Sequence, residues 1–151
     1  MAKELRSQSW RTMRPIKCFG IARFHRSFAT KRANKGVVYD LEERTARFAE
    51  AVIDFVKTIP QDAVTNRIIS QLVGAATSVG ANYVEADDAV SKREFLKSIG
   101  TCPKEARETK HFLRMIVRVS PELKPRARIL WTEAKELHLI FSKIRRTGKN
   151  E

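Results

Sequence analysis

Three residues that could bind a metal ion follow one another at steps of three: Glu105, Glu108 and His111, within the stretch KEARETKHFLR (104–114). A Glu-x-x-His pair at this spacing can present a carboxylate and an imidazole on one side of a helix. In di-iron four-helix bundles, two such motifs and two further glutamates project inward and hold the metals. The direction in which this helix faces therefore decides whether a metal site is a reasonable interpretation.

Four amphipathic helices are predicted to carry these and the other polar residues. The first begins after Asp40, which suits an N-cap, and ends before Pro60. Its apolar stripe, which includes Thr45, recurs at steps of 4, 3, 4, 3 and 4 between Leu41 and Ile59. The second helix covers about 63–89, and the aspartate before it suits its N-cap.

The third and fourth helices follow after short connections. The third starts with a capping box made by Ser91 and Glu94, and it contains Pro103, which should kink it about one turn earlier. The fourth covers about 125–146, and Gly148 suits its end. Four such helices without a competing strand pattern predict an all-α fold, an antiparallel up-down-up-down four-helix bundle.

The Glu-x-x-His residues do not point into the core of this bundle together. On a helical wheel Glu105 lies about 50° from the apolar stripe of the third helix, Glu108 about 110° and His111 about 170°. Glu85 and Asp88 on the second helix also point away from their own stripe. An internal di-metal site is therefore disfavoured, and neither a metal nor a cofactor is predicted.

The outward face of the third helix carries a basic stripe. Its members recur at steps of 4, 7, 3, 4, 3 and 4: Arg93, Lys97, Lys104, Arg107, His111, Arg114 and Arg118. A row of cations on an exposed helix can follow a phosphate backbone, whereas a solvated face with excess positive charge is the alternative. We interpret the six Lys and Arg members as a candidate nucleic-acid-binding surface.

Other charged residues lie on the flanks of the helices, between the core and the surface. We expect four of them to form ion pairs between helices or between subunits: Arg44, Arg47, Glu105 and Glu108. Such pairs would set register and partner choice more than stability. Ordinary exposure to solvent is the alternative.

Positive charge is concentrated at the N-terminus. The chain has 30 Lys and Arg against 17 Asp and Glu, a net charge of +13, and residues 1–38 hold ten basic residues and one acid. We expect residues 1–38 to be a flexible basic extension and residues 39–148 to be the bundle. The extension resembles a nucleic-acid arm, an organellar transit peptide or a stretch before a start codon assigned too early. The charge as a whole predicts a polyanionic partner.

No catalytic set is present in the sequence. It contains no G-x-S-x-G, P-loop, G-x-G-x-x-G or H-E-x-x-H motif, so no enzyme activity is predicted. Cys102 lies on an apolar stripe and is interpreted as a core residue, and His138 as a core-edge histidine with a backbone partner. No apolar run approaches the roughly 18 residues of a membrane span, and the cysteines form no C-x-x-C. We therefore expect a cytoplasmic protein without a membrane partner.

Three stretches of the sequence resemble one bacterial family. They are YDL (39–41) at the start of the first helix, SVGANYVEA (78–86) in the second and SKREFLKSIGTCPKEARETKHFLRMI (91–116) on the third. Over about residues 39–146 the chain is similar to the four-helix-bundle proteins encoded in 23S rRNA intervening sequences, also labelled S23 ribosomal protein. Relatives of that family include the accessory variability proteins of diversity-generating retroelements.

The resemblance implies a bundle that assembles into a ring-like homopentamer, without known catalysis. Through the retroelement relatives it also implies a basic surface that binds nucleic acid and a reverse transcriptase. With the basic stripe, it predicts a non-enzymatic oligomeric protein that binds RNA or DNA. The alternative is a homo-oligomeric scaffold that docks a protein partner such as a reverse transcriptase and has no specific nucleic-acid site.

Overall fold

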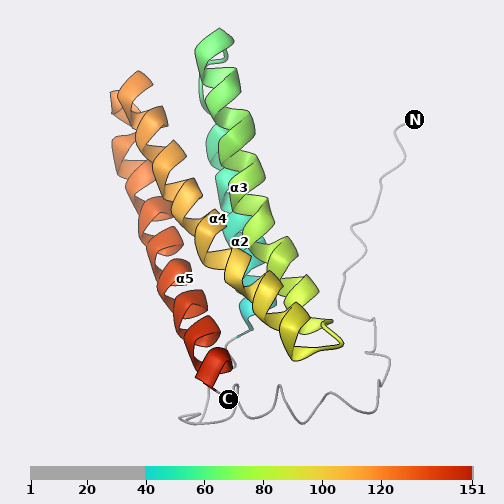
Figure 1. The fold of residues 1–151 in the computed structure, drawn as a ribbon. Coiled ribbons are helices and arrows are strands. Elements are labelled where there is room, and N and C mark those ends of the chain that lie inside the picture. The colour runs from blue at the N-terminus through green and yellow to red at the C-terminus, as the bar shows by residue number, and fades with distance from the viewer. Residues whose placement is uncertain (1–39, 151) are drawn as a thin grey trace, which may run out of the picture. The chain divides into compact units, whose positions relative to one another are not determined.

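The computed structural model describes residues 40–150, so the prediction for residues 1–38 lies outside the described residues. The elements follow in this order: α2 (Leu41–Val56), α3 (Ala63–Asp87), α4 (Lys92–Val119), the short 3-10 helix η2 (Pro121–Leu123) and α5 (Lys124–Asn150). Figure 1 shows the four long helices as one bundle, with α4 beside α5. All secondary structure in residues 40–150 is helical, which confirms the all-α fold.

Side-chain caps set the beginnings of α2 and α3. Asp40 Oδ1 accepts a hydrogen bond from the N–H of Glu43 at 3.1 Å, as an N-cap should. Asp62 accepts from the N–H of Thr65 at 2.8 Å, and the Thr65 hydroxyl accepts from the N–H of Asp62 at 2.8 Å. This second arrangement is a full capping box in which threonine replaces the usual glutamate, so α3 is capped more completely than the sequence predicted.

The capping box predicted for α4 is only half correct. The Ser91 hydroxyl accepts from the N–H of Glu94 at 3.2 Å, as expected. The Glu94 carboxylate, however, accepts from the N–H of Val90 at 3.1 Å and not from that of Ser91. The glutamate therefore ties the preceding turn to the helix start.

The core contains the apolar stripes of all four helices. Its largest fully buried apolar side chains are Val52 and Phe55 of α2, Leu72 and Val79 of α3, Ile99, Leu113 and Ile116 of α4, and Leu137 and Phe141 of α5. Each contributes about 1.5–3 kcal/mol by leaving water. None of the helices in residues 40–150 combines the length and apolarity needed to span a membrane.

The last helix does not end where predicted. Gly148 was expected at the stop, but α5 continues to Asn150 and Gly148 is buried within it. A Cβ atom at this position would lie 3.2 Å from Cδ2 of Leu96 and 3.4 Å from Cε1 of Phe95. The glycine therefore allows the end of α5 to approach the start of α4 closely. Because the end of one helix lies beside the start of the other, the two helices run antiparallel.

Candidate nucleic-acid interface

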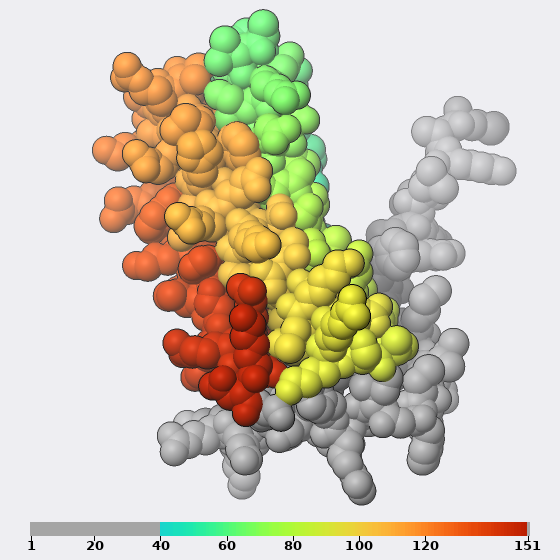
Figure 2. All heavy atoms as spheres, viewed as in Figure 1, coloured from blue at the N-terminus to red at the C-terminus, as the bar shows by residue number. Residues whose placement is uncertain are grey.

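The predicted basic stripe lies on the surface of α4. Its six Lys and Arg residues are all exposed: Arg93, Lys97, Lys104, Arg107, Arg114 and Arg118. Within residues 40–150, none of them forms an ion pair with a carboxylate. Figure 2 shows α4 at the front of the molecule, with α5 along its edge. The stripe is therefore a row of exposed cations on α4, and Arg114 lies beside the line where α4 meets α5.

Two contacts fix the register of α4 against α5. The Nζ atom of Lys110 lies over the ring of Trp131, 5.5 Å from its centroid. Further along, Nδ1 of His138 is 2.9 Å from the carbonyl oxygen of Pro103, and because a carbonyl can only accept, Nδ1 carries the hydrogen. This contact confirms the backbone partner predicted for His138. We call the line of contacts from Arg114 to Pro103 on α4, with the facing residues of α5, the α4–α5 seam.

Cavities at both ends of the seam are lined by cations and by no carboxylate. One has a volume of about 500 Å³ and is lined by Leu113, Arg114, Val117, Lys124, Ala127, Arg128 and Trp131. The other has a volume of about 240 Å³ and is lined by Pro103, Ser142, Arg145, Arg146 and Lys149. The seam thus lies between the basic stripe of α4 and a second group of cations, which α5 contributes to the two cavities.

Cations of both helices lie near Lys110 in the middle of the seam. The pKa of Lys110 is lowered, first by burial and then by repulsion from Arg107 on its own helix and from Lys135 on α5. A neighbouring carboxylate would have raised the pKa instead. The cations of both helices are therefore close enough to repel one another, and an external anion would relieve that repulsion.

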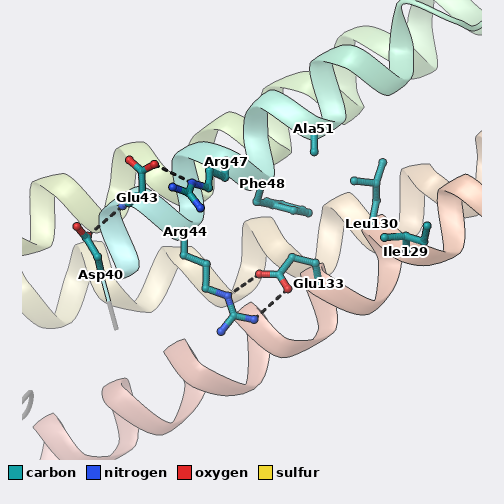
Figure 3. A pocket seen from close by; sticks show the side chains of 9 residues that line it. All are labelled: Asp40, Glu43, Arg44, Arg47, Phe48, Ala51, Ile129, Leu130 and Glu133. Atoms are coloured by element: carbon teal, nitrogen blue, oxygen red, sulfur yellow. Dashed lines mark hydrogen bonds and ion pairs between the residues drawn. The ribbon is translucent and has the colours of Figure 1, made fainter. Parts of the chain in front are cut away.

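The acids of α5 face away from the seam. Glu133 and Glu136 are its only acids, and both contact Arg44 of α2. Nε and Nη2 of Arg44 donate to the two oxygens of Glu133 at 2.6 and 2.9 Å, as Figure 3 shows, and Nη2 also donates to Glu136 at 2.5 Å. The hydrogen bond with Glu133 is the main cause that raises the pKa of Arg44. Both acids of α5 therefore lie on the α2 side, as does Arg126, whose Nη1 donates to the Thr58 hydroxyl at 3.0 Å. The cations of α5 that line the two seam cavities are Lys124, Arg128, Arg145, Arg146 and Lys149.

The remaining flank residues have different surroundings. Arg47 pairs with Glu43 of its own helix at 2.7 Å. Glu105 is half-buried, and its pKa is raised, first by burial and then by repulsion from Glu108. Neither glutamate has an ion pair within residues 40–150, so pairing between subunits stays a prediction for them. The sequence analysis missed the two glutamates that Arg44 contacts, although their wheel positions, opposite most of the cations of α5, were a usable signal.

The Glu-x-x-His motif does not gather at one point. His111 is exposed, and its ring lies edge-on to Phe112 with centroids 5.3 Å apart. Among residues 40–150, no three His, Cys, Asp or Glu side chains are placed to hold a metal ion. Cys102 is fully buried, and burial raises the pKa of its thiol to about 12, so it packs as an unreactive core residue.

Comparison with known proteins identifies the bundle. The family of 23S rRNA-intervening sequence proteins has a model that matches residues 39–143. The chain belongs to this family. The match includes α2, α3 and α4 and ends inside α5. In this 23S rRNA-intervening sequence protein, the three cations Arg145, Arg146 and Lys149 therefore lie beyond the matched residues.

One solved structure has the same fold. It is a protein of unknown function from the S23 ribosomal protein family of Bacteroides thetaiotaomicron, with a TM-score of 0.62 and 21% sequence identity. The alignment covers 69% of this chain and 96% of that one. No match was found among curated proteins.

Proposed function

We propose that this 23S rRNA-intervening sequence protein is a non-enzymatic nucleic-acid-binding protein that uses the α4–α5 seam as its binding surface. One observation carries the proposal: cations from both helices line the seam, while the only acids of α5 are held on its other side by Arg44. A surface sorted in this way attracts a polyanion more strongly than the same charges scattered among acids.

The dimensions of the stripe suit several successive phosphates. From Arg93 to Arg118 the helix rises by about 38 Å, at 1.5 Å per residue. That length spans about 11 nucleotides of one duplex strand at 3.4 Å each. The family description refers to an rRNA intervening sequence, which supports RNA as the first ligand to test. This role also requires a location where RNA is present, which in a bacterium is the cytoplasm.

Binding across a salt series tests the proposal. A structured RNA and a duplex DNA of equal length are titrated with the full-length protein and with residues 39–151. We expect the shorter protein to retain binding, with an affinity that falls steeply as salt rises, because each phosphate contact releases a counterion. Binding by the full-length protein alone would instead assign the effect to residues 1–38 and contradict a role for the seam.

Two charge-matched double variants localise the surface. Arg107→Gln with Arg114→Gln removes two cations at the seam, and Arg67→Gln with Lys143→Gln removes two exposed cations elsewhere. We expect the seam variant to lower the salt slope by about 1 to 2, because the slope changes by about 0.7–0.9 per phosphate contact. The control should change it much less. Equal effects would show that only total charge matters.

A second candidate function rests on the groove between α2 and α5. This groove has a volume of about 670 Å³, and Phe48, Ala51 and Leu130 line it beside Ile129, which is 71% exposed. Figure 3 shows these side chains between the two helices, next to Glu133. An exposed apolar groove with a charged rim fits a protein contact, so it supports a homo-oligomeric scaffold that docks a partner such as a reverse transcriptase.

Light scattering during size-exclusion chromatography separates the two candidates. Ile129→Glu should lower the oligomer mass if the groove joins subunits, and it should leave the mass unchanged if it does not. A bundle that assembles through this groove but shows no salt-dependent nucleic-acid binding would favour the scaffold. The pentamer number comes only from the family resemblance, and the measured mass tests it directly.

A further inference from the structure

Arg145 on α5 has a buried nitrogen without a partner. Among residues 40–150, its Nε is the one buried side-chain nitrogen or oxygen that forms no hydrogen bond. Leaving a buried donor unpaired is unfavourable, and more so for a charged group, so such an arrangement calls for an explanation. No carboxylate within residues 40–150 forms an ion pair with this arginine.

Gly100 on α4 makes room for the guanidinium. A Cβ atom at position 100 would lie 3.1 Å from Nε of Arg145 and 3.5 Å from its Cζ. A Cβ atom here would require the arginine side chain to move by a few tenths of an ångström. Gly100 inside α4 and Arg145, two residues beyond the end of the family match, thus combine to hold a cation against the bundle.

The carbonyl that Pro103 leaves without its helical donor does not account for this placement. Pro103 has no N–H, so the carbonyl of Ile99 loses its usual donor one turn later in the helix. The Nε–H of Arg145 forms no hydrogen bond with that carbonyl, or with any other group in residues 40–150. The arginine is therefore not held here to satisfy the broken helix ladder.

The surroundings of Arg145 are themselves cationic. Arg146 and Lys149 line the same cavity of about 240 Å³, and the Ser142 hydroxyl adds a hydrogen-bond donor. No carboxylate lines it. Three cations within two turns of one helix repel one another, so the free protein holds them together at a cost. A bound anion would relieve the repulsion and accept hydrogen bonds from the polar groups that line the cavity.

We propose that the cavity of Ser142, Arg145, Arg146 and Lys149 is a binding site for a phosphate-class oxyanion. A phosphate can accept from planar guanidinium groups, a lysine and a hydroxyl at once, and such charge-assisted bonds are among the strongest in proteins. The site lies at one end of the seam, but phosphate can bind there in a protein that never binds a nucleic-acid strand, and the reverse is equally true.

Titration of inorganic phosphate into the full-length protein tests the site. Calorimetry is run at constant ionic strength, with chloride replacing phosphate in the reference. We expect saturable binding of one phosphate per chain in the wild type. Arg145→Gln should weaken it by about tenfold or more, as expected for loss of a hydrogen-bonded charge. The matched control is Lys143→Gln, which removes a positive charge from an exposed position of the same helix and should change the affinity by less than about twofold.

A charge-neutral variant separates the pocket from total charge. Gly100→Ala removes no cation and should favour the helix, because alanine is a better helix former than glycine. We expect it to displace the guanidinium and weaken phosphate binding severalfold in a protein that remains folded by circular dichroism. Absence of phosphate binding to the wild type, or equal affinities for wild type, Arg145→Gln and Lys143→Gln, would overturn the proposal.

A pair of RNA oligonucleotides then identifies the source of the phosphate. The two share one sequence, and one carries a 5′-phosphate where the other has a 5′-hydroxyl. A preference for the phosphorylated strand that Arg145→Gln abolishes would assign the site to a strand end. Equal binding of both strands, together with the phosphate titration above, would assign it to free phosphate. Either result supports the oxyanion site, and the seam variants test strand binding independently.

Discussion

Arg44 on α2 and Glu133 on α5 form a bidentate ion pair between two helices that are far apart in the sequence. The nitrogen–oxygen distances are 2.6 and 2.9 Å, and the two side chains are 27% and 32% exposed. Two parallel hydrogen bonds between planar groups fix direction as well as distance. The pair therefore holds α5 in the rotation that turns its two acids toward α2 and leaves the cations that line the seam cavities beside α4.

A double-mutant cycle measures this contact. Arg44→Gln and Glu133→Gln, singly and together, should give a coupling energy of about 1 kcal/mol in the free energy of unfolding, because the pair is partly shielded and bidentate. The control cycle at Arg47 and Glu43, an exposed pair within one helix, should give about 0.3–0.5 kcal/mol. Urea unfolding provides both coupling energies. Equal values would show that the pair between helices stabilises the fold no more than an exposed pair within one helix.

Two glycines of α3 should respond differently to alanine. Gly74 is exposed and a Cβ there would meet nothing within 4 Å, whereas at Gly80 it would lie 3.3 Å from Oγ1 of Thr45 on α2. Gly74→Ala should therefore raise the free energy of unfolding by about 1 kcal/mol, the helix-propensity difference. Gly80→Ala should gain clearly less, because the buried Thr45 must move. Equal gains in urea unfolding would mean that α2 and α3 are not closely packed at this point.

The hydrogen bond from His138 to the carbonyl of Pro103 should contribute measurably to stability. His138→Leu keeps an apolar side chain of similar size but removes the donor, and we expect a loss of about 1 kcal/mol. His138→Asn keeps a donor at the position of Nδ1 and should recover part of that loss. The comparison of the two variants in urea unfolding matters more than either value, and a leucine variant as stable as the wild type would contradict the contact.

The faces of the helices could be predicted from sequence better than their contacts. Apolar spacing was enough to place Leu113 in the core and Arg107 on the surface, because helical periodicity alone decides these directions. The partners of Arg44 depend on which helices are neighbours and on their rotation, which spacing within one helix does not contain. The same reason explains the error at Gly148. A glycine near the end of a helical pattern usually marks the C-terminus of the helix, but here the close contact with α4 requires a glycine inside α5.

The cavity at Arg145 is the clearest case of a feature that needs the fold. Its cations are visible in the sequence as a basic helix end, which usually complements the helix dipole. Their meaning changes once α5 is placed antiparallel to α4, because Gly100 and Pro103 then form the opposite wall. Residues 45 positions apart meet there, and no local pattern connects them.

The raised pKa of Glu105 predicts a stability that depends on pH. Burial and the neighbouring Glu108 disfavour its charged form in the folded protein, so the wild type loses stability as the pH rises above the ordinary pKa, and the loss is complete above the raised one. Below the ordinary value of 4.5 the carboxyl is neutral in both states and the penalty vanishes. Glu105→Gln should therefore be more stable than the wild type at pH 7, by less than about 1 kcal/mol, and equal to it near pH 3.5.

Unfolding of this variant in urea at both pH values provides the measurement. Glu50→Gln, at an exposed position of α2, controls for the loss of one negative charge from a basic chain. A loss of stability for Glu105→Gln at pH 7 would reverse the prediction. It would indicate instead that the charged carboxylate has a cationic partner, as an ion pair between subunits would provide.

Trp131 should report directly on ligand binding at the seam. The chain has two tryptophans, so Trp10→Phe leaves Trp131 as the only source of indole fluorescence. Lys110 lies over its ring, and a phosphate that binds Lys110 would change the field at the indole. We therefore expect RNA to shift or quench the emission in a saturable way, with the same midpoint as anisotropy of the labelled RNA and with reversal by salt.

Adding Arg114→Gln should move both midpoints together, whereas adding Arg67→Gln should move neither. RNA binding seen by anisotropy with unchanged emission would place the ligand away from the seam.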